Sequence, residues 1–219
     1  MMIRENLQAI RKELPPGVRL VAVSKFHPLE RLQEAYEAGQ RLFGENRPQE
    51  LAAKAQLMPA DTEWHFIGHL QTNKIKQVLP YVSMVESVDS LHLLQAVEDW
   101  GARAGRVADV LLEQHISREA SKQGFSGEET LALLERAAGF PHVRFRGLMG
   151  MASLTGDEAV IGEEFARIAE LKAEANRRFP ELTAFDELSI GMSGDWRLAL
   201  RYGATIIRLG TAIFGPREY

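Results

Sequence analysis

Cysteine is absent from the 219 residues, which excludes disulfide bonds, thiolate catalysis and every zinc or iron–sulfur site with cysteine ligands. Hydrophobic runs are short, because no stretch approaches the roughly 18 apolar residues of a membrane span. The charged N-terminal segment also lacks the apolar core of a signal peptide. Basic residues are not in excess, with 26 Lys and Arg against 30 Asp and Glu, whereas nucleic-acid-binding proteins normally carry a basic surplus. We therefore expect a cytoplasmic protein that binds neither membrane nor nucleic acid.

The composition is otherwise that of a folded domain, with 45% hydrophobic and 26% charged residues. Apolar side chains recur at helical spacing from Ile3 to Leu14, and the Pro-Pro-Gly sequence at 15–17 ends this helix. No linker, charge block or low-complexity tract follows it. The chain is therefore expected to form a single domain over residues 1–219, with an N-terminal helix within residues 1–16.

Short apolar runs alternate with amphipathic segments along the rest of the chain. The runs predict strands at 18–24, 41–44, 64–68, 84–88, 110–116, 145–151, 188–192 and 206–210. The amphipathic segments predict helices at 28–38, 49–57, 72–79, 91–104, 128–138, 161–178 and 196–202. One helix after each strand is typical of βαβ units with a parallel sheet. Eight near-regular units favour a closed (β/α)8 TIM barrel of the α/β class, and a doubly wound open sheet is the alternative.

Lys25 differs in position from the other lysines, because it directly follows the first buried strand. The other six fall in predicted helices or polar loops, where a solvated charge is expected: Lys12, Lys54, Lys74, Lys76, Lys122 and Lys172. In barrels of this class, catalytic and binding residues lie at the carboxyl ends of the strands. Burial favours the neutral amine, which can attack an aldehyde to form a Schiff base. The alternative is a lysine that extends to solvent or pairs with a carboxylate such as Glu45.

Small and hydroxyl-bearing residues follow the last two predicted strands, at 191–195 and 208–211. Ser193 is expected to cap the helix that begins there, and the backbone N–H groups would form an anion pocket. In barrels, the loops after strands seven and eight often bind phosphate. Closure of the barrel would place this pocket beside Lys25. A lysine next to a phosphate pocket indicates a phosphorylated aldehyde as ligand.

Six motifs follow one another along the chain: VAVSK at 21–25, FGENR at 43–47, WHFIG at 64–68, SVDS at 87–90, GLMGM at 147–151 and GMSGD at 191–195. Together they resemble those of the pyridoxal phosphate homeostasis protein family, whose barrel is similar to the N-terminal barrel of alanine racemase. The resemblance implies a fold type III barrel without the C-terminal β domain of the racemases. It also implies pyridoxal 5′-phosphate (PLP) as cofactor, held as a Schiff base on Lys25.

The resemblance assigns roles to the remaining site residues. The phosphate would contact Ser193, Gly210 and Thr211, Arg208 would face the pyridine nitrogen, and Asn46 would lie near the ring. The whole predicted cofactor-binding set is Lys25, Asn46, Met192, Ser193, Arg208, Gly210 and Thr211. No catalytic residue and no metal ligand is expected.

The family is associated with storage, protection or delivery of the cofactor, and apo enzymes that need PLP would be the recipients. Arg208 fits this role, because a permanent positive charge at the pyridine nitrogen disfavours ring protonation and weakens the ring as an electron sink. Racemases also use a tyrosine from a second domain, for which this sequence leaves no room before its end at Tyr219. We expect no enzyme activity. The alternatives are a racemase or lyase with weak activity and, more remotely, an aldolase that uses Lys25 on a sugar phosphate.

Three further expectations concern loops, histidines and assembly. His65 and His69 would lie about 13 Å apart along a strand, too far to share one metal ion, and His65 is expected to line the barrel mouth. His27 and His115 stand where the family usually has Lys and Asn. The polar loop at 118–127 resembles a mobile lid, in which Lys122 would accept the aldehyde during transfer, and an ordinary surface loop is the alternative. The mixed charge of the predicted surface helices favours a monomer.

Overall fold

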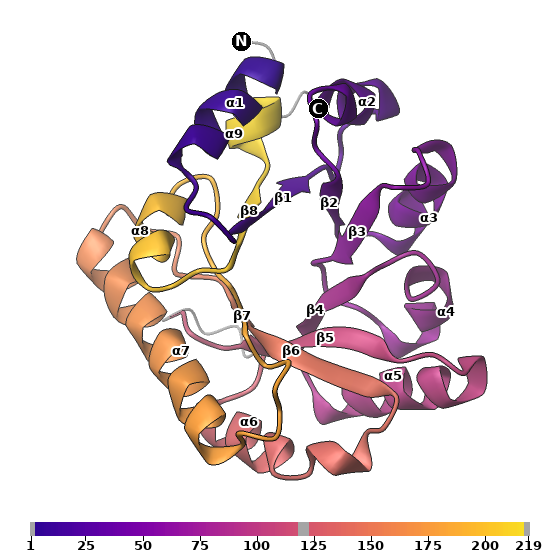
Figure 1. Ribbon diagram of the computed structural model, residues 1–219, viewed down its shortest axis with the longest axis vertical. Helices are drawn as coiled ribbons and strands as arrows, with labels where there is room; N and C mark the ends of the chain where they lie inside the picture. Colours follow the sequence, from indigo (N-terminus) through magenta and orange to yellow (C-terminus); the bar gives the residue numbers. More distant parts are fainter. Residues whose placement is uncertain (1–2, 118–122, 217–219) are drawn as a thin grey trace.

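Eight parallel strands form a closed barrel in chain order in the computed structural model, which describes residues 3–117 and 123–216. Helices surround this ring of strands (Figure 1). The strands are β1 (Arg19–Val23), β2 (Leu42–Glu45), β3 (Glu63–Phe66), β4 (Met84–Val88), β5 (Ala108–Gln114), β6 (Val143–Gly150), β7 (Glu187–Ser189) and β8 (Ile206–Leu209). The barrel closes where β1 pairs with β8, with Arg19 opposite Ile206 and Ala22 opposite Leu209. The predicted (β/α)8 barrel is confirmed, and the open sheet is excluded.

The helices lie close to their predicted positions. They are α1 (Ile3–Glu13), α2 (Leu29–Glu37), α3 (Pro48–Leu57), α4 (Ile75–Val78), α5 (Leu91–Ala104), α6 (Gly127–Leu134), α7 (Glu158–Arg178), α8 (Trp196–Arg201) and α9 (Thr211–Phe214), with 3₁₀ turns η1 (Thr72–Lys74) and η2 (Ala137–Gly139). α9 was not expected. α7 starts three residues earlier than expected, because the Asp157 side chain accepts hydrogen bonds from the N–H groups of Ala159 and Val160 and caps the helix. No helix of the described residues is long and apolar enough to cross a bilayer.

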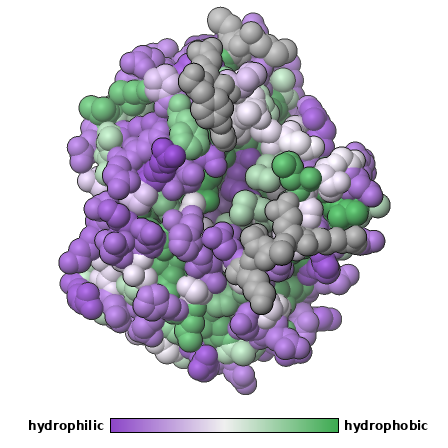
Figure 2. Space-filling model, turned by 180° about the vertical axis from the view of Figure 1, so that it is seen from behind, coloured by the Kyte–Doolittle hydropathy of each residue, from purple (hydrophilic) through white to green (hydrophobic). Residues whose placement is uncertain are grey.

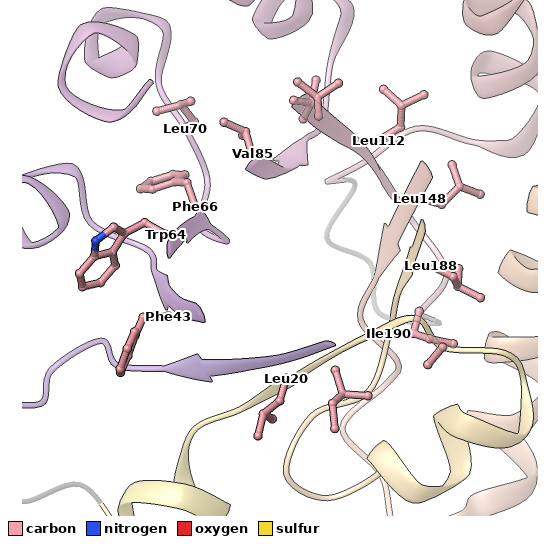
Figure 3. Close-up of a cluster of buried hydrophobic side chains, with 14 of the residues drawn as sticks. Leu20, Phe43, Trp64, Phe66, Leu70, Val85, Leu112, Leu148, Leu188 and Ile190 are labelled. Atoms are coloured by element: carbon pink, nitrogen blue, oxygen red, sulfur yellow. The ribbon is translucent and has the colours of Figure 1, made fainter. Parts of the chain in front are cut away.

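Alternating side chains along each strand give the barrel two hydrophobic layers. Side chains on the outer face of the strands pack against the helices, and Figure 3 shows Phe43, Trp64 and Leu148 among them pointing away from the barrel axis. A smaller cluster fills the interior and consists of Val21, Leu42, Met84, Leu111, Met149 and Ile206. The remaining interior positions hold polar side chains, including Arg208 on β8 and Glu86 on β4. The fold therefore concentrates polar groups inside the barrel rather than only around its rim.

Two glycines allow backbone geometry that other residues would not. Gly147 in β6 has φ +148, and a Cβ there would lie 1.9 Å from the carbonyl oxygen of Glu187 in β7. The pairing of β5 with β6 shifts register at this point. Gly191 has φ +95 and is packed against Ala199 and Trp196, so the backbone leaves the extended conformation there. For this reason β7 ends before its predicted end at Met192.

α1 lies beside α9 on the side of the barrel where β8 meets β1 (Figure 1). Ile3, Leu7 and Ile10 are buried and belong to the same hydrophobic cluster as the outer faces of the strands. Asn6 Nδ2 also donates to the carbonyl oxygen of Ile213 in α9, at 2.8 Å. The predicted N-terminal helix is confirmed, and it covers the segment in which the barrel closes.

Candidate functional site

A cavity of about 470 Å³ opens at the carboxyl ends of the strands, next to the junction of β8 and β1. Six of the seven predicted cofactor-binding residues line it: Lys25, Met192, Ser193, Arg208, Gly210 and Thr211. They come from opposite ends of the sequence, and barrel closure brings them together. The remaining lining residues include Val23, Ile67 and the segment Met151–Thr155, which follows β6.

Lys25 occupies a tight turn that begins where β1 ends. The N–H of His27 donates to the carbonyl oxygen of Ser24 at 3.1 Å and closes the turn. Phe26 has φ 67, a conformation in which a bulky side chain is strained, as often happens at functional sites. The guanidinium of Arg47 stacks over the Phe26 ring at 4.5 Å. Lys25 is thus presented by a turn and not by regular strand.

A buried ion-pair network lies directly behind this turn. Lys54 Nζ donates to Glu45 Oε1 and to the Ser24 carbonyl oxygen, both at 2.8 Å, and to Glu50 Oε1 at 2.7 Å. Ser24 Oγ donates to Glu45 Oε1 at 2.6 Å. Burial raises the pKa of Glu45, and the charge and hydrogen bond of Lys54 oppose that shift. The network holds the end of β1 against α3.

This network corrects two expectations. Lys54 was expected to be solvated, but its side chain is only 9% exposed. Glu45 was considered as a partner for Lys25, and it binds Lys54 instead, because α3 directs Lys54 back onto the ends of β1 and β2. The nine-residue separation between Glu45 and Lys54 matches no local pairing rule, so sequence spacing alone gave no signal of the contact.

Arg208 lies in the floor of the cavity and is 4% exposed. Its Nη1 donates to the backbone carbonyl of Ser189 at 2.8 Å and to Ser189 Oγ at 2.5 Å, and its Nη2 donates to the carbonyl of Gly150 at 2.9 Å. Glu86 Oε2 lies 3.7 Å from Nη1. Burial lowers the pKa of Arg208, whereas the carboxylates of Glu86, Glu113 and Asp195 oppose that shift. A fixed guanidinium therefore faces the cavity.

His65 was expected to line the barrel mouth, but it lies inside the barrel, below Arg208. Its Nδ1 is 2.5 Å from Glu86 Oε1, and its Nε2 is 3.4 Å from Arg19. Both His65 and Glu86 are fully buried. The inward position of His65 follows from strand alternation, because its neighbours Trp64 and Phe66 both point outward to the helices.

Burial alone would raise the pKa of Glu86, but its contacts with His65, Arg208 and Ser189 together hold that pKa below the ordinary value. Ser189 Oγ donates to Glu86 Oε2 at 2.5 Å and also accepts from Arg208. A continuous polar chain thus runs from the cavity floor through the barrel interior. Its residues fix the orientation of the Arg208 guanidinium.

Ser193 does not cap the helix that follows it. α8 begins at Trp196 with Asp195 in the capping position, and Ser193 Oγ accepts from the N–H of Ala212 at 3.3 Å. Asp195 Oδ1 accepts from the N–H of Met192 at 2.6 Å, and burial raises the pKa of Asp195. The turn at 192–195 separates Ser193 from α8, which begins at its predicted first residue, Trp196. Ser193 instead joins the loop after β7 to the loop after β8.

Asn46 lies beside the cavity without lining it. It follows β2, and its Oδ1 is buried with no hydrogen-bond partner among the described residues. Gly68 is packed so closely that a Cβ there would lie 2.6 Å from Asn46 Cβ. A buried acceptor without a partner is costly in a folded protein and is typical of positions that a ligand completes.

The segment after β6 is the part of the site that sequence reasoning missed. Met151 and Leu154 are exposed hydrophobic residues on the rim, and Leu154 is 96% exposed. Ser153 is held from below, because its Oγ donates to Glu164 at 2.6 Å. The GLMGM motif ends at Met151 and could have pointed to this segment. Its apolar residues gave no sign that the chain after them lines the rim of the cavity.

The other residues singled out from the sequence lie outside the cavity lining. His27 stacks on Phe214 with ring centroids 4.7 Å apart, His69 pairs with Asp89 at 2.8 Å, and His115 is exposed after the end of β5. Lys122 and the first half of the proposed lid, residues 118–122, lie outside the described residues. Within the described ranges, no group of three His, Asp or Glu side chains is arranged to hold a metal ion.

A family model described as "Alanine racemase, N-terminal domain" matches residues 2–218. Curated relatives named pyridoxal phosphate homeostasis protein match over nearly their full length. The protein from Vibrio alginolyticus is 37% identical over 99% of this chain and 98% of its own, and the protein from Pseudomonas aeruginosa is 39% identical over 99% and 92%. These comparisons confirm the resemblance carried by the six motifs.

Solved structures with the same fold include PipY of Synechococcus elongatus with PLP bound. It superposes with a TM-score of 0.91 at 39% identity, over 98% of this chain and 100% of PipY. Alanine racemase from Bartonella henselae is only 15% identical, with a TM-score of 0.73 over 98% of this chain and 58% of the racemase. That second likeness shows the shared barrel and nothing further.

Proposed function

Because this chain belongs to the alanine racemase N-terminal domain family and matches pyridoxal phosphate homeostasis proteins end to end, we propose that it binds PLP and acts in PLP homeostasis. The observation that carries the proposal is the meeting of Lys25, Arg208 and the loop residues Ser193, Gly210 and Thr211 in one cavity. These groups offer an amine, a fixed cation and small polar residues, which suit an aldehyde, a pyridine ring and a phosphate.

The chemistry of the donor set fits the cofactor. Ser193, Gly210 and Thr211 would hold the phosphate, with Met192 beside them, and Arg208 would face the ring nitrogen. Asn46 would contribute its buried Oδ1, which has no hydrogen-bond partner among the described residues, near the ring. When bound, PLP supplies an aldehyde that condenses with a lysine amine to a Schiff base, and we propose Lys25 as that lysine.

We propose a carrier and not an enzyme. The relatives are named for homeostasis and not for a reaction. Arg208, held by Ser189 and Gly150, would keep a positive charge at the ring nitrogen and disfavour its protonation. The described tyrosines engage other partners: Tyr36 hydrogen-bonds Asp61, Tyr81 hydrogen-bonds Gln56, and Tyr202 packs against Phe165. None of these three is placed as the second base of a racemase.

The carrier would store or protect PLP in the cytoplasm and deliver it to apo enzymes. Delivery would require a recipient to reach the bound aldehyde at the carboxyl ends of the strands. Polar residues cover most of the face shown in Figure 2, with hydrophobic residues in small separate groups. This surface supports a monomer, which light scattering at two protein concentrations would test.

The deciding experiment is a PLP titration followed by visible spectroscopy, borohydride reduction and peptide mapping. We expect one reduced adduct, on Lys25, and its loss in Lys25→Ala. Lys76→Ala, at an exposed position on α4, is the matched control and should keep the adduct. An adduct spread over surface lysines would contradict the proposal. Turnover of L- or D-alanine well above that of free PLP would overturn the carrier role in favour of a racemase.

A further inference from the structure

The peptide groups on both sides of Lys25 are held by side chains of one helix, α3. Lys54 Nζ donates to the carbonyl oxygen of Ser24 at 2.8 Å, just before Lys25. Glu50 Oε1 accepts from the N–H of Phe26 at 2.8 Å, just after Lys25. Lys54 and Glu50 lie one helical turn apart and bind each other at 2.7 Å. The backbone of Lys25 is therefore gripped from both ends by a single ion pair.

The turn at 24–27 needs these two contacts from α3 to keep its conformation. Its third residue, Phe26, has φ 67, a conformation that turns of type II require and that glycine normally supplies. A bulky side chain in this conformation is strained and persists only where neighbouring contacts enforce it. The N–H of Phe26 and the carbonyl of Ser24 are the two groups by which α3 enforces it.

The ion pair is also far more rigid than a surface pair. The Lys54 side chain is 9% exposed and the Glu50 side chain 21%, and Lys54 binds in addition Glu45, which is fully buried. Surface pairs between long side chains are loosely held and contribute little. Here three oxygens lie within 2.8 Å of Lys54 Nζ: the carbonyl of Ser24 and the carboxylates of Glu45 and Glu50. Because Ser24 belongs to the turn, the fixed position of Lys54 also fixes the turn.

We propose that Lys54 and Glu50 are positioning residues that aim Lys25 at the cofactor aldehyde. This inference rests on the proposed function. As the amine of Lys25 adds to the aldehyde carbon, a carbon–nitrogen bond forms and water leaves, and this step needs a narrow range of approach. The orientation of Lys25 therefore affects the affinity for PLP. It does not affect the affinity for a ligand that lacks the aldehyde.

Glu50→Ala is the variant that tests this role. Lys54 is less suitable, because its removal leaves the buried carboxylate of Glu45 without a cation and endangers the fold. We expect Glu50→Ala to bind PLP about tenfold more weakly, which is the usual effect of losing one hydrogen bond to a charged group. Binding of pyridoxine 5′-phosphate, an alcohol that cannot condense with Lys25, should stay unchanged. Amide exchange at Phe26 should accelerate, because its N–H loses the Glu50 acceptor.

Two control variants sharpen the comparison. Glu50→Gln keeps an acceptor oxygen for the Phe26 N–H and should restore most of the PLP affinity. Gln49→Ala changes the exposed neighbouring position on α3 and should behave as the unaltered protein.

The outcomes separate this inference from the proposed function. Equal losses for PLP and pyridoxine phosphate, or unaltered PLP binding in Glu50→Ala, would overturn the positioning role and leave PLP binding on Lys25 intact. Absence of any Lys25 adduct in the unaltered protein would overturn the proposed function, and the positioning role with it. An aldehyde-specific loss with rescue by Glu50→Gln supports both.

Discussion

Glu86 lies between His65 and Arg208 inside the barrel. The ionisation of this single residue makes the stability of the fold depend on pH. Its carboxylate is fully buried, and its pKa in the folded protein lies below the ordinary value of 4.5. A folded pKa below the unfolded one means that ionised Glu86 stabilises the fold above the unfolded pKa. That contribution disappears as the pH falls through the folded pKa.

We therefore predict that Glu86→Gln is less stable at neutral pH by about 3 kcal/mol, because buried Arg208 loses its counterion. The variant should also lose stability less steeply than the unaltered protein as the pH falls below 4.5, because there Glu86 of the unaltered protein takes up a proton in the unfolded state before it does so in the folded state. Urea unfolding at pH 7 and at a series of lower pH values measures both effects. The control is Glu13→Gln, which removes an exposed partner of Arg197 and should change little. Equal stability of Glu86→Gln and the unaltered protein at pH 7 would contradict the prediction.

Single residues were also where the sequence was least informative. The sequence indicated Lys25 as a candidate site residue because it follows an apolar run. It indicated the segments 191–195 and 208–211 because small residues follow predicted strands there. Lys54 could not, since its partners Glu45 and Ser24 reach it only through tertiary packing. The left-handed conformation of Phe26 was equally hidden, because it is imposed by neighbours against the preference of the residue itself.

At the scale of elements, boundaries depend on capping and on close backbone approach. α7 gains a first turn because Asp157 caps it, and β7 ends early because Gly191 leaves the extended conformation. The register shift between β5 and β6 occurs where Gly147 meets Glu187. Apolar periodicity predicted that these elements exist. It carried no signal for ends that are set by single hydrogen bonds or by the absence of a Cβ.

We predict that Asp157→Ala lowers the free energy of unfolding by about 1 kcal/mol, the typical value of an N-terminal cap. The reason is that the N–H groups of Ala159 and Val160 lose the Asp157 carboxylate as acceptor. Asp157→Asn keeps an acceptor oxygen and should lose much less. Chemical denaturation of the three proteins side by side measures the difference. Indistinguishable midpoints for Asp157→Ala and the unaltered protein would show that the cap contributes nothing.

At the scale of the whole molecule, regular alternation of strands and helices made the barrel predictable. Parallel strands that are buried on both faces read as apolar runs, and eight of them close on themselves. The polar interior was not predictable in the same way. Arg19, His65 and Glu86 look like isolated polar interruptions in the sequence, and only closure of the barrel turns them toward one another.

We predict that PLP stabilises the whole fold and not only its site, because in the proposed site the ligand would bridge β1 and β8. At one hundred times its dissociation constant, PLP should raise the free energy of unfolding by about 2.7 kcal/mol. Lys25→Ala at the same PLP concentration should show a smaller gain. Denaturation in the presence and absence of PLP, with absorbance as a second probe, measures both. An equal gain in both proteins would place the binding energy elsewhere than on Lys25.

The pairing of β1 with β8 also dictates when the site can exist during synthesis. The ribosome makes Lys25 long before Arg208, Gly210 and Thr211. Until β8 has been made, a nascent chain therefore has the lysine turn without the groups that would retain a phosphate. Under the proposed function, cofactor retention would begin only when β8 has been released and has docked beside β1, so a chain truncated before β8 would not sequester PLP through this site.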